Sequence, residues 1–554
     1  MIGAQILIEC LKREGVEVIF GYPGGQVLPI FDRLYDADVK FILTRHEQGA
    51  AHAADGYARA TGKVGVCLAT SGPGATNLVT GIANAYMDSI PMVAITGQVK
   101  SFLIGNDAFQ EADITGITRP ITKHNFLVKD IKDLARIVRE AFYIASTGRP
   151  GPVVIDIPSD IQMQDTFFVW PEKVEMRSYQ PTYFGHPGQI KKAVKLIANS
   201  KKPLIYAGGG IITSGANAAL LELAEKIQAP VTWTLMGIGA FPGTHKLSLG
   251  MLGMHGTAYA NHAIMGADLI IAVGARFDDR VTGRIDSFAP GAKVIHIDID
   301  PSSISKNIKV DVPIVGDAKN ILGEILEQIK IGPDTAEWLK AVDALKKKYP
   351  LKYKDGERIK PQYVLEQLYD ITKGDVIIAT EVGQNQMWAC QWLKYDHPRT
   401  FISSGGLGTM GFGFPAAMGA KVGCSDKTVI DIAGDGSIQM NIQELGTCVA
   451  NKINVKVFIL NNGYLGMVRQ WQELFYKKRY SQVGISSPDF VKLAESYGAV
   501  GICVKKKEDV RPAIEKALKT DNTVFIDFHV EPEENVFPMV PAGEAINRMI
   551  EGLA

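Results

Sequence analysis

A glycine turn between two apolar strands, within residues 431–463, constrains this chain more than any other feature. The run Val429–Ala433 is short and β-branched, which suits a buried parallel strand better than a helix. The triplet Gly-Asp-Gly at 434–436 follows at once, and glycines there allow a sharp turn and a close approach to a ligand. A helix that opens near Ser437 points its free N–H groups at an anion. The sequence therefore predicts a diphosphate site in this turn.

The second strand of this unit, Val455–Asn462, places the amide oxygen of Asn462 at its carboxyl end. Asp435 supplies an anionic oxygen in the preceding turn. Two protein oxygens together with diphosphate oxygens are what a Mg²⁺ site requires. Taken singly, Asp435 can simply cap a helix, and the pair Asn461 and Asn462 can simply turn the chain. The prediction of a metal site therefore depends on the combination of the two motifs.

Charge and composition exclude several classes of protein. Lys+Arg and Asp+Glu number 59 each, so no net field attracts nucleic acid or an anionic membrane. No apolar run approaches the ~20 residues of a membrane span, and the first residues carry charges where a signal peptide needs an apolar centre. The six cysteines are scattered without metal-ligand spacing, as expected of reduced structural thiols. We predict a cytoplasmic protein that binds neither nucleic acid nor a membrane.

The 554 residues are too many for one hydrophobic core. Strands and helices alternate within 1–165, 189–330 and 361–554, which predicts three doubly wound α/β domains with parallel sheets and with ligands beyond the carboxyl ends of the strands. We expect linkers at 166–188, which is rich in Pro and aromatic residues, and at the Lys-rich stretch 330–360. The final segment is expected to be a loop and a short helix that fold over a site.

Glu47 ends a predicted strand and begins an alanine-rich helix. A carboxylate in that place can do no more than favour the helix N-terminus. Together with the Gly-Asp-Gly and Asn-Asn motifs, its position resembles that of the glutamate that hydrogen-bonds the cofactor's aminopyrimidine ring in thiamine-diphosphate enzymes. The resemblance implies acid–base catalysis by proximity within the cofactor. It also implies at least a dimer, because the family's glutamate comes from the partner subunit.

Longer motifs show which thiamine-diphosphate enzymes the chain resembles most. The stretches TRHEQGAAHAADGYARATG, LGMHGT, GARFDDRVTG, GLGTMGFGFPAAMGA and MVRQWQ look like those of the catalytic large subunits of biosynthetic acetohydroxyacid (acetolactate) synthases. The likeness covers essentially the whole chain, and other thiamine carboligases lack GARFDDRVTG and MVRQWQ. It implies decarboxylation of pyruvate and transfer of the two-carbon unit to a second pyruvate or to 2-ketobutyrate. The products would be acetolactate and acetohydroxybutyrate, in the first common step of branched-chain amino-acid biosynthesis.

The resemblance implies three cofactors: thiamine diphosphate in the first and third domains, Mg²⁺ in the third, and FAD in the middle domain. The Mg²⁺ ligands would be Asp435, Asn462 and the main-chain carbonyl of Tyr464. Gly408 and Met410 would contact the pyrimidine ring, although a methionine in such a run is also a common core filler. The other implied cofactor contacts are Gly434, Asp435, Gly436, Ser437, Arg149, Gly208, Gly209, Gly210, Thr234, Leu235, Met236, His255, Arg276, Asp278 and Asp298.

The same resemblance implies which residues bind the substrate. Arg280 resembles the arginine that binds the keto-acid carboxylate, for which a forked guanidinium is suited, unless it pairs with Asp278 or Asp279 instead. Trp471 resembles the tryptophan whose face favours 2-ketobutyrate over pyruvate; the alternative is that it covers a surface. The positions that match the family's active-site entrance are Phe109, Gln110, Lys123, Met254 and His255. The resemblance further implies a homodimer or homotetramer with interfacial active sites, and a separate regulatory small subunit.

Three other functions stay open at this point. An FAD-dependent pyruvate oxidase has the same expected fold but a different reaction. A catabolic acetolactate synthase performs the same reaction without FAD. A nucleotide-sensing module would use Mg²⁺ and phosphate without catalysis.

Overall fold

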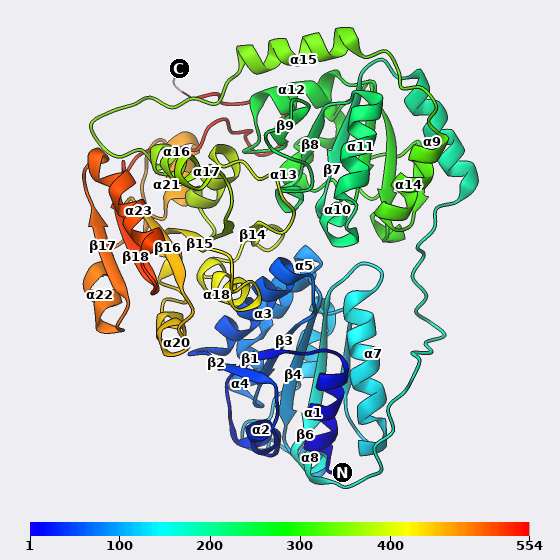
Figure 1. Ribbon diagram of the computed structural model, residues 1–554, viewed down its shortest axis with the longest axis vertical. Helices are drawn as coiled ribbons and strands as arrows, with labels where there is room; N and C mark the ends of the chain where they lie inside the picture. The colour runs from blue at the N-terminus through cyan, green and yellow to red at the C-terminus, as the bar shows by residue number, and fades with distance from the viewer. Residues whose placement is uncertain (553–554) are drawn as a thin grey trace.

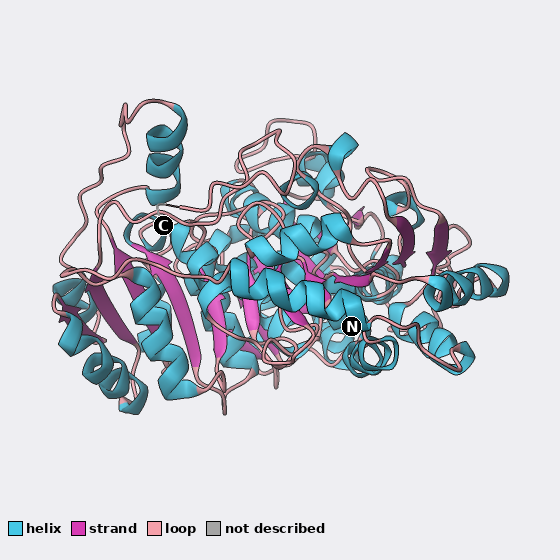
Figure 2. Cartoon of the chain, turned by 90° about the horizontal axis from the view of Figure 1, so that it is seen from above, coloured by secondary structure: helices cyan, strands magenta, loops and turns pink. Residues whose placement is uncertain are grey.

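The computed structural model, described over residues 1–552, forms three α/β domains, each built on a six-stranded sheet. Figure 1 places the first domain at the bottom, the middle domain at the upper right and the third at the upper left. Every strand pairing within the three sheets is parallel. Figure 2 shows helices on both sides of the strands. The predicted α/β class with three parallel sheets is therefore confirmed.

The first sheet has the strand order β2-β1-β3-β4-β6-β5. Its strands are β1 (Val18–Gly21), β2 (Lys40–Leu43), β3 (Gly65–Ala69), β4 (Met92–Gln98), β5 (His124–Leu127) and β6 (Pro152–Pro158). Its helices are α1 (Gly3–Arg13), α2 (Leu28–Tyr35), α3 (Glu47–Thr61), α4 (Pro73–Asn77), α5 (Val79–Asp88), α6 (Ile114–Thr118), α7 (Leu134–Ser146) and α8 (Ser159–Met163). The strand order reverses between β1 and β3, which is where such sheets bind ligands.

The third sheet, β14-β13-β15-β16-β18-β17, repeats the strand order of the first. Its strands are β13 (Ile377–Thr380), β14 (Phe401–Ser403), β15 (Val429–Gly434), β16 (Val455–Asn461), β17 (Val500–Val504) and β18 (Val524–His529). Its helices are α16 (Pro361–Thr372), α17 (Gln384–Trp392), α18 (Gly413–Gly423), α19 (Asp435–Ile438), α20 (Glu444–Ala450), α21 (Gly466–Phe475), α22 (Phe490–Ser496) and α23 (Val510–Lys519). The order reverses between β13 and β15, so the Gly-Asp-Gly turn lies at a ligand-binding position.

The middle sheet has a different order, β12-β11-β10-β7-β8-β9. Its strands are β7 (Pro203–Ala207), β8 (Val231–Trp233), β9 (Ser248–Met251), β10 (Leu269–Val273), β11 (Lys293–Asp298) and β12 (Val312–Val315). Its helices are α9 (Pro187–Asn199), α10 (Gly209–Ser214), α11 (Asn217–Ile227), α12 (Ala258–Gly266), α13 (Asp279–Thr282) and α14 (Ala318–Gln328), followed by α15 (Ala336–Lys348). This is the doubly wound order of dinucleotide-binding domains, with its switch point between β7 and β10.

Helix α15 corrects the second predicted linker, since it occupies much of the stretch 330–360. Trp338 and Val342 are buried, and the indole Nε1 of Trp338 donates to the carbonyl of Pro203 at 3.0 Å. The helix was missed because its many lysines hide an apolar pair spaced by one helical turn. Residues 166–186 form no helix and no strand, in agreement with the first linker. The domain limits 1–165, 189–330 and 361–554 stay predictions.

The helix expected near Ser437 is present as α19, which begins at Asp435 and is one turn long. The prediction of a short helix at the C-terminal end is wrong. The C-terminal segment, described to residue 552, forms no helix; Met539 instead bridges Ile550 in antiparallel fashion. The backbone N–H of Val540 donates to the carbonyl of Met254 at 2.9 Å, so this segment is held against the middle domain. The expectation that it folds over a site agrees with this position.

The hydrophobic cores join the domains. One apolar cluster contains residues of the first and third domains, among them Ala50, Ala53, Phe412 and Ala416. A second cluster contains residues of the middle and third domains. The contact between the first and third domains centres on α3 and α18, whose backbones approach closely: a Cβ on Gly56 would lie 2.1 Å from the carbonyl oxygen of Ala416. No helix among residues 1–552 has the length and apolar character that a membrane span requires.

We predict that Gly419→Ala destabilises the chain. The added Cβ would lie 1.8 Å from the carbonyl oxygen of Ala53, so α3 and α18 must separate, at a cost of ~1–3 kcal/mol. Thermal unfolding measures the effect. The matched control is Gly323→Ala in α14, where nothing lies within 4 Å of the new Cβ and a helix gains ~0.5–1 kcal/mol from alanine. Equal midpoints for the two variants would contradict the prediction.

Candidate active site

Asp435 occupies a buried turn at the switch point of the third sheet. It follows β15 directly, and its side chain is almost fully buried. The carboxylate accepts hydrogen bonds from the backbone N–H of Asn462 (3.4 Å) and of Gly463 (3.2 Å) and from Oγ of Ser487 (3.2 Å). These donors are all neutral, and burial raises the pKa of Asp435 to about 6. A buried carboxylate without a cationic side-chain partner has the chemistry of a ligand for a metal ion.

Asn462 lies next to Asp435, as the two-motif prediction requires. Its Nδ2 donates to Oε1 of Gln384 at 3.2 Å, and its Oδ1 accepts from the backbone N–H of Tyr464 at 3.0 Å. The turn therefore brings together carboxylate, amide and main-chain oxygens, all hard ligands of the kind that Mg²⁺ prefers. Whether Asp435, Asn462 and Tyr464 bind the ion stays a prediction.

The glycine tract between β14 and α18, residues 403–411, passes over this turn. Cε of Met410 would lie 3.9 Å from a Cβ placed on Gly436, so the thioether reaches the Gly-Asp-Gly turn. Gly408 has a φ of 68°, and nothing lies within 4 Å of a Cβ placed there, so space for a ligand remains beside its backbone. The structure thus brings Gly408, Met410 and the Asp435 turn to one edge of the third sheet.

Glu381 and Gln384 belong to the same edge but were missed in the sequence. The buried carboxylate of Glu381 accepts from the backbone N–H of Gly411 (2.7 Å) and of Phe414 (3.0 Å), which fixes the end of the glycine tract. Burial raises its pKa to about 7. The available signal was a glutamate directly after a buried strand, the same placement that drew attention to Asp435.

Glu47 lies at the carboxyl edge of the first sheet. Its Oε2 accepts from Nδ2 of Asn77 at 2.9 Å, and its Oε1 would lie 3.3 Å from a Cβ on Gly74. Gln110, with a φ of 60°, packs its backbone against Gly72, the residue before α4. Glu47 and Gln110 therefore both lie against the start of α4. Among the described residues, the carboxylates of Glu47 and Asp435 have no hydrogen-bond partner in common.

Two further entrance residues of the first domain, Phe109 and Lys123, lie apart from each other. Phe109 is highly exposed beside Gln110. Lys123 lies elsewhere: its Nζ donates to the carbonyl of Thr147 (2.8 Å) and to the hydroxyl of Tyr179 (2.9 Å). Burial lowers its pKa to about 7. Within one chain, Lys123 is not brought to the Glu47 edge, and its place at the active-site entrance stays a prediction.

Met254 and Arg280 line one cavity of about 230 Å³, together with the C-terminal residues 540–543 and Ile546. Nη1 of Arg280 lies 3.8 Å from Sδ of Met254. Arg280 forms only a weak ion pair with Asp279, because its Nε lies 3.7 Å from that carboxylate and 63% of the arginine side chain is exposed. The guanidinium is thus open to an anion from solution.

His255 and Trp471 lie outside that lining. His255 is buried, which lowers its pKa to about 4, and its carbonyl accepts from Gln391 at 2.9 Å. Trp471 is half-buried on α21 and packs on Phe475 with ring centroids 5.3 Å apart. The neighbouring Gln470 bonds both the N–H and the carbonyl of Val536, so α21 is tied to the segment that covers the cavity.

The predicted FAD contacts gather at the switch point of the middle sheet. Gly208 follows β7, and Gly209 and Gly210 open α10. A Cβ on Gly208 would lie 2.0 Å from the carbonyl oxygen of Gly274, in the turn after β10. Thr234, Leu235 and Met236 follow β8, Arg276 and Asp278 follow β10, and Asp298 ends β11. Arg149 reaches across from the first domain, with its Nη1 3.1 Å from Oδ2 of Asp300.

A separate polar group lies near the end of the third sheet. Cys503, Asp527 and His529 approach within 4.8 Å of one another. Asp527 already accepts from Asn461 at 2.9 Å and lies 3.2 Å from Nε2 of His529. Thiol and imidazole do not suit Mg²⁺, so this group does not compete with the Asp435 turn as the magnesium site.

Comparisons with known proteins agree with this geometry. Three family profiles match the chain: the N-terminal thiamine pyrophosphate binding domain over residues 1–117, the central domain over 190–325 and the C-terminal thiamine pyrophosphate binding domain over 381–528. The chain therefore belongs to the thiamine pyrophosphate enzymes. It binds thiamine diphosphate in its first and third domains.

Relatives that match over nearly their full length identify the group within this enzyme family to which the chain belongs. The chain is 52% identical to the acetolactate synthase large subunit of Haemophilus influenzae, over 99% of the chain and 98% of that protein. It is 50% identical to the acetolactate synthase isozyme 3 large subunit of Escherichia coli, over 99% and 98%. It is 52% identical to a probable acetolactate synthase large subunit of Methanocaldococcus jannaschii, over 100% and 95%. The chain belongs to the acetolactate synthase large-subunit family.

We predict that Asp435→Asn abolishes metal-dependent binding of thiamine diphosphate, because it removes the only charged side chain that this turn offers to the ion. Calorimetric titration of the metal-free protein with Mg²⁺ and thiamine diphosphate measures it. The matched control is Asp156→Asn, another buried carboxylate held by the neutral donors Thr96 and Gln98. Unchanged affinity and metal dependence in Asp435→Asn would show that the site is elsewhere.

Proposed function

We propose that this chain is the catalytic subunit of an acetolactate synthase, which decarboxylates pyruvate and joins the two-carbon unit to a second 2-keto acid. The products are 2-acetolactate and, with 2-ketobutyrate, 2-aceto-2-hydroxybutyrate, in branched-chain amino-acid biosynthesis. The observation that carries the proposal is the buried Asp435 turn with Met410 over it, in a chain half identical to proteins of that name over nearly their full length.

The residues fit thiamine diphosphate and Mg²⁺. Asp435, Asn462 and the carbonyl of Tyr464 would hold the ion, and the N–H groups after Gly434 would face the diphosphate. When bound, thiamine diphosphate supplies a carbon nucleophile and a sink for the electrons released with CO₂. The side chain of Met410, which lies over the turn, would limit how the cofactor can lie there.

Glu47 would hold a proton at the aminopyrimidine nitrogen. Its carboxylate is oriented by Asn77, a neutral partner that leaves it free to exchange a proton. Among the described residues, Glu47 and Asp435 have no hydrogen-bond partner in common, and the complete site would combine the Glu47 edge of one subunit with the Asp435 edge of another. Two copies related by a twofold axis would form two such sites.

The middle domain would bind FAD. Its strand order and the close backbone approach of Gly208 to Gly274 at the switch point fit a dinucleotide. Asp298 at the end of β11 is a buried carboxylate whose pKa is raised to about 6 by burial, and it lies where such domains bind a ribose. FAD would serve structure rather than redox chemistry, because the net reaction transfers no electrons to an acceptor.

The substrate carboxylate would meet Arg280 at the cavity beneath the C-terminal segment. The exposed guanidinium can bind a carboxylate through two parallel hydrogen bonds. The segment from Val536 to Ile546 would exclude water from the cavity and so limit proton transfer from solvent at the reacting centre. The large-subunit names of the relatives support a separate regulatory small subunit as partner. The cytoplasmic location stays a prediction.

Product analysis tests the proposed function. The protein with thiamine diphosphate, Mg²⁺ and FAD is incubated with pyruvate alone and then with 2-ketobutyrate added, and the acetohydroxy acids are measured. Absence of any C–C product would favour a sensing module. Stoichiometric bleaching of FAD by pyruvate without oxygen, at the rate of turnover, would favour a pyruvate oxidase. Absence of a flavin absorbance band from active protein would favour the FAD-independent synthase.

We predict that two inactive variants complement each other. Glu47→Gln should lower turnover by at least ~10²-fold, as expected for a positioned acid–base group, and Asp435→Asn should lose the cofactor. In a mixture refolded together, each mixed dimer regains one site with both native residues. Activity should then return to about a quarter of the native value for random pairing of subunits. No recovery above the separate variants would show that each site lies within one chain.

We predict that Trp471→Leu lowers the preference for 2-ketobutyrate by roughly tenfold, because one methylene is worth ~1–3 kcal/mol against an indole face. Decarboxylation of pyruvate should be largely retained. A competition assay with both keto acids measures the product ratio. Phe475→Leu, which removes the ring packed on Trp471, is the control and should change the ratio less. An unchanged ratio in Trp471→Leu would make the residue structural.

A further inference from the structure

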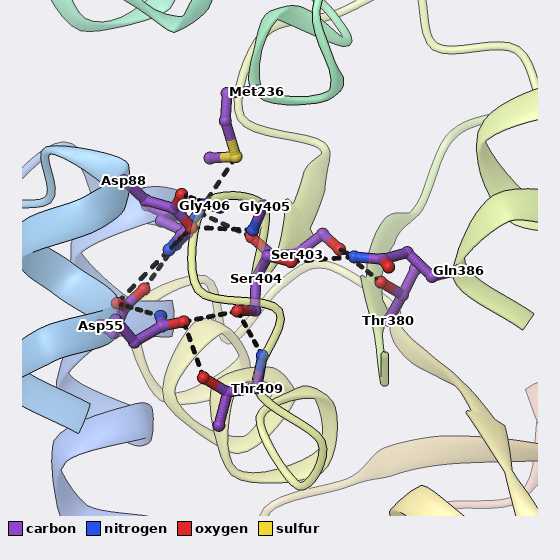
Figure 3. Close-up of polar contacts among 12 residues, drawn as sticks. Asp55, Asp88, Met236, Thr380, Gln386, Ser403, Ser404, Gly405, Gly406 and Thr409 are labelled. Carbon is purple, nitrogen blue, oxygen red and sulfur yellow. Dashed lines mark hydrogen bonds and ion pairs between the residues drawn. The ribbon is translucent and has the colours of Figure 1, made fainter. Parts of the chain in front are cut away.

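A buried ion triad joins the first domain to the glycine tract of the third (Figure 3). Arg59 and Asp55 lie one turn apart on α3 and pair directly, while Nη2 of Arg59 lies 2.9 Å from Oδ2 of Asp88 at the end of α5. The three side chains are between 0% and 5% exposed. Ion pairs this deep are costly to bury and are retained only with full hydrogen bonding.

Asp88 and Arg59 hold the start of the glycine tract. The carboxylate of Asp88 accepts from the backbone N–H of Gly405 (3.0 Å) and of Gly406 (2.6 Å). Nη1 of Arg59 donates to the carbonyl of Ser403 at 2.8 Å. A glycine tract has little conformational preference of its own, so charge-assisted hydrogen bonds of this kind decide its path.

A second row of contacts continues along the tract. Asn84, one turn before Asp88 on α5, accepts from Oγ of Ser404 (2.5 Å) and from Oγ1 of Thr409 (3.3 Å). Oγ of Ser404 also accepts from the backbone N–H of Thr409 at 2.8 Å. On the far side, Nε2 of Gln386 donates to Oγ of Ser403 at 2.6 Å. All the tract residues held by these hydrogen bonds, from Ser403 to Thr409, precede Met410 in the sequence.

Glu381 fixes the other end of the tract at Gly411 and Phe414. Gly408 and Met410 therefore lie between two anchored ends, one held from the first domain and one from the third. Between these two anchors, Gly408 borders open space, since no atom lies within 4 Å of a Cβ added there. The position of Met410 over the Gly-Asp-Gly turn then depends on both anchors.

The middle domain meets the same unit through Met236. Its Sδ lies 3.9 Å from Nη1 of Arg59 and would lie 2.5 Å from a Cβ on Gly405. Met236 belongs to the turn after β8, at the edge where the flavin is proposed to bind. Arg59 thus contacts Asp55 and Asp88 of the first domain, Met236 of the middle domain and Ser403 of the third.

We propose that Arg59 and Asp88 are positioning residues for thiamine diphosphate: they set the path of the tract 403–409 and so the placement of Gly408 and Met410. The inference rests on the proposed cofactor site and adds residues that do not touch the cofactor. Through Met236, the same unit makes thiamine diphosphate binding depend on the order of the middle domain. By linkage, the two cofactors then strengthen each other's binding.

Asp88→Asn is the sharpest test. The triad carries two carboxylates and one guanidinium, so this change leaves Arg59 paired with Asp55 and no charge isolated, which favours a folded variant. The amide keeps one acceptor, so one of the two tract N–H groups loses its partner. We expect the dissociation constant of thiamine diphosphate to rise by about tenfold or more, as for loss of one charge-assisted hydrogen bond.

The readouts separate positioning from stability. Fluorescence titration gives the dissociation constant of thiamine diphosphate with and without FAD, and near-ultraviolet circular dichroism reports the bound aminopyrimidine. At saturating cofactor, kcat should fall while KM for pyruvate is retained, and the dichroic signal should weaken. Glu14→Gln, which breaks the Arg139 ion pair elsewhere in the first domain, is the matched control and should change none of these.

The outcomes are distinct. Native affinity and native dichroism in a less stable Asp88→Asn protein would make the triad merely structural and overturn the inference. Failure of the native protein to bind thiamine diphosphate would instead overturn the proposed function. If Asp88→Asn does not fold, Arg59→Lys is used, since it keeps the charge but cannot reach Asp55, Asp88 and Ser403 together. Native affinity in that variant would equally overturn the inference.

Discussion

The close packing of α3 on α18 is the contact on which the other features depend. Gly56 and Gly419 let the two backbones approach so closely that no Cβ fits between them. Helix α3 begins at Glu47 and carries Arg59, and α18 follows the glycine tract that carries Gly408 and Met410. The distance between α3 and α18 therefore fixes how the carboxyl edge of the first sheet lies relative to that of the third sheet. Larger residues at these glycines would separate them even if both sheets stayed intact.

The carboxylates of the candidate site fall into two groups that differ in their hydrogen-bond partners. The carboxylates expected to act on a cofactor, Glu47 and Asp435, have only neutral partners and stay available to a proton or a metal ion. The carboxylates that hold backbone, Asp88 and Glu381, use their charge on peptide N–H groups of the tract. Burial raises the pKa of Glu381 to about 7, which shows how much solvation such a structural carboxylate gives up.

The sequence predicted the central strands and the turns after them, because those strands are buried on both faces and read as continuous apolar runs. Five of the six edge strands, β5, β9, β12, β14 and β17, carry no such fully buried run, because burial at the edge of a sheet is partial. Asp435 and Asn462 were placed together correctly because parallel strands end at one edge. Glu381, Gln384 and the Arg59 triad were missed, since their roles come from contacts between segments up to hundreds of residues apart, which no local pattern encodes.

The identical strand order of the first and third sheets makes α3 and α18 equivalent helices, each following the second strand of its own domain. Their mutual contact is thus a contact of like with like, of the kind that a twofold axis generates between subunits. A single chain already has the internal arrangement of a dimer of two equal halves. In the proposed dimer, two chains would bring together four related sheets, with the carboxylate of Glu47 at the edge of each first sheet and the diphosphate turn of Asp435 at the edge of each third sheet.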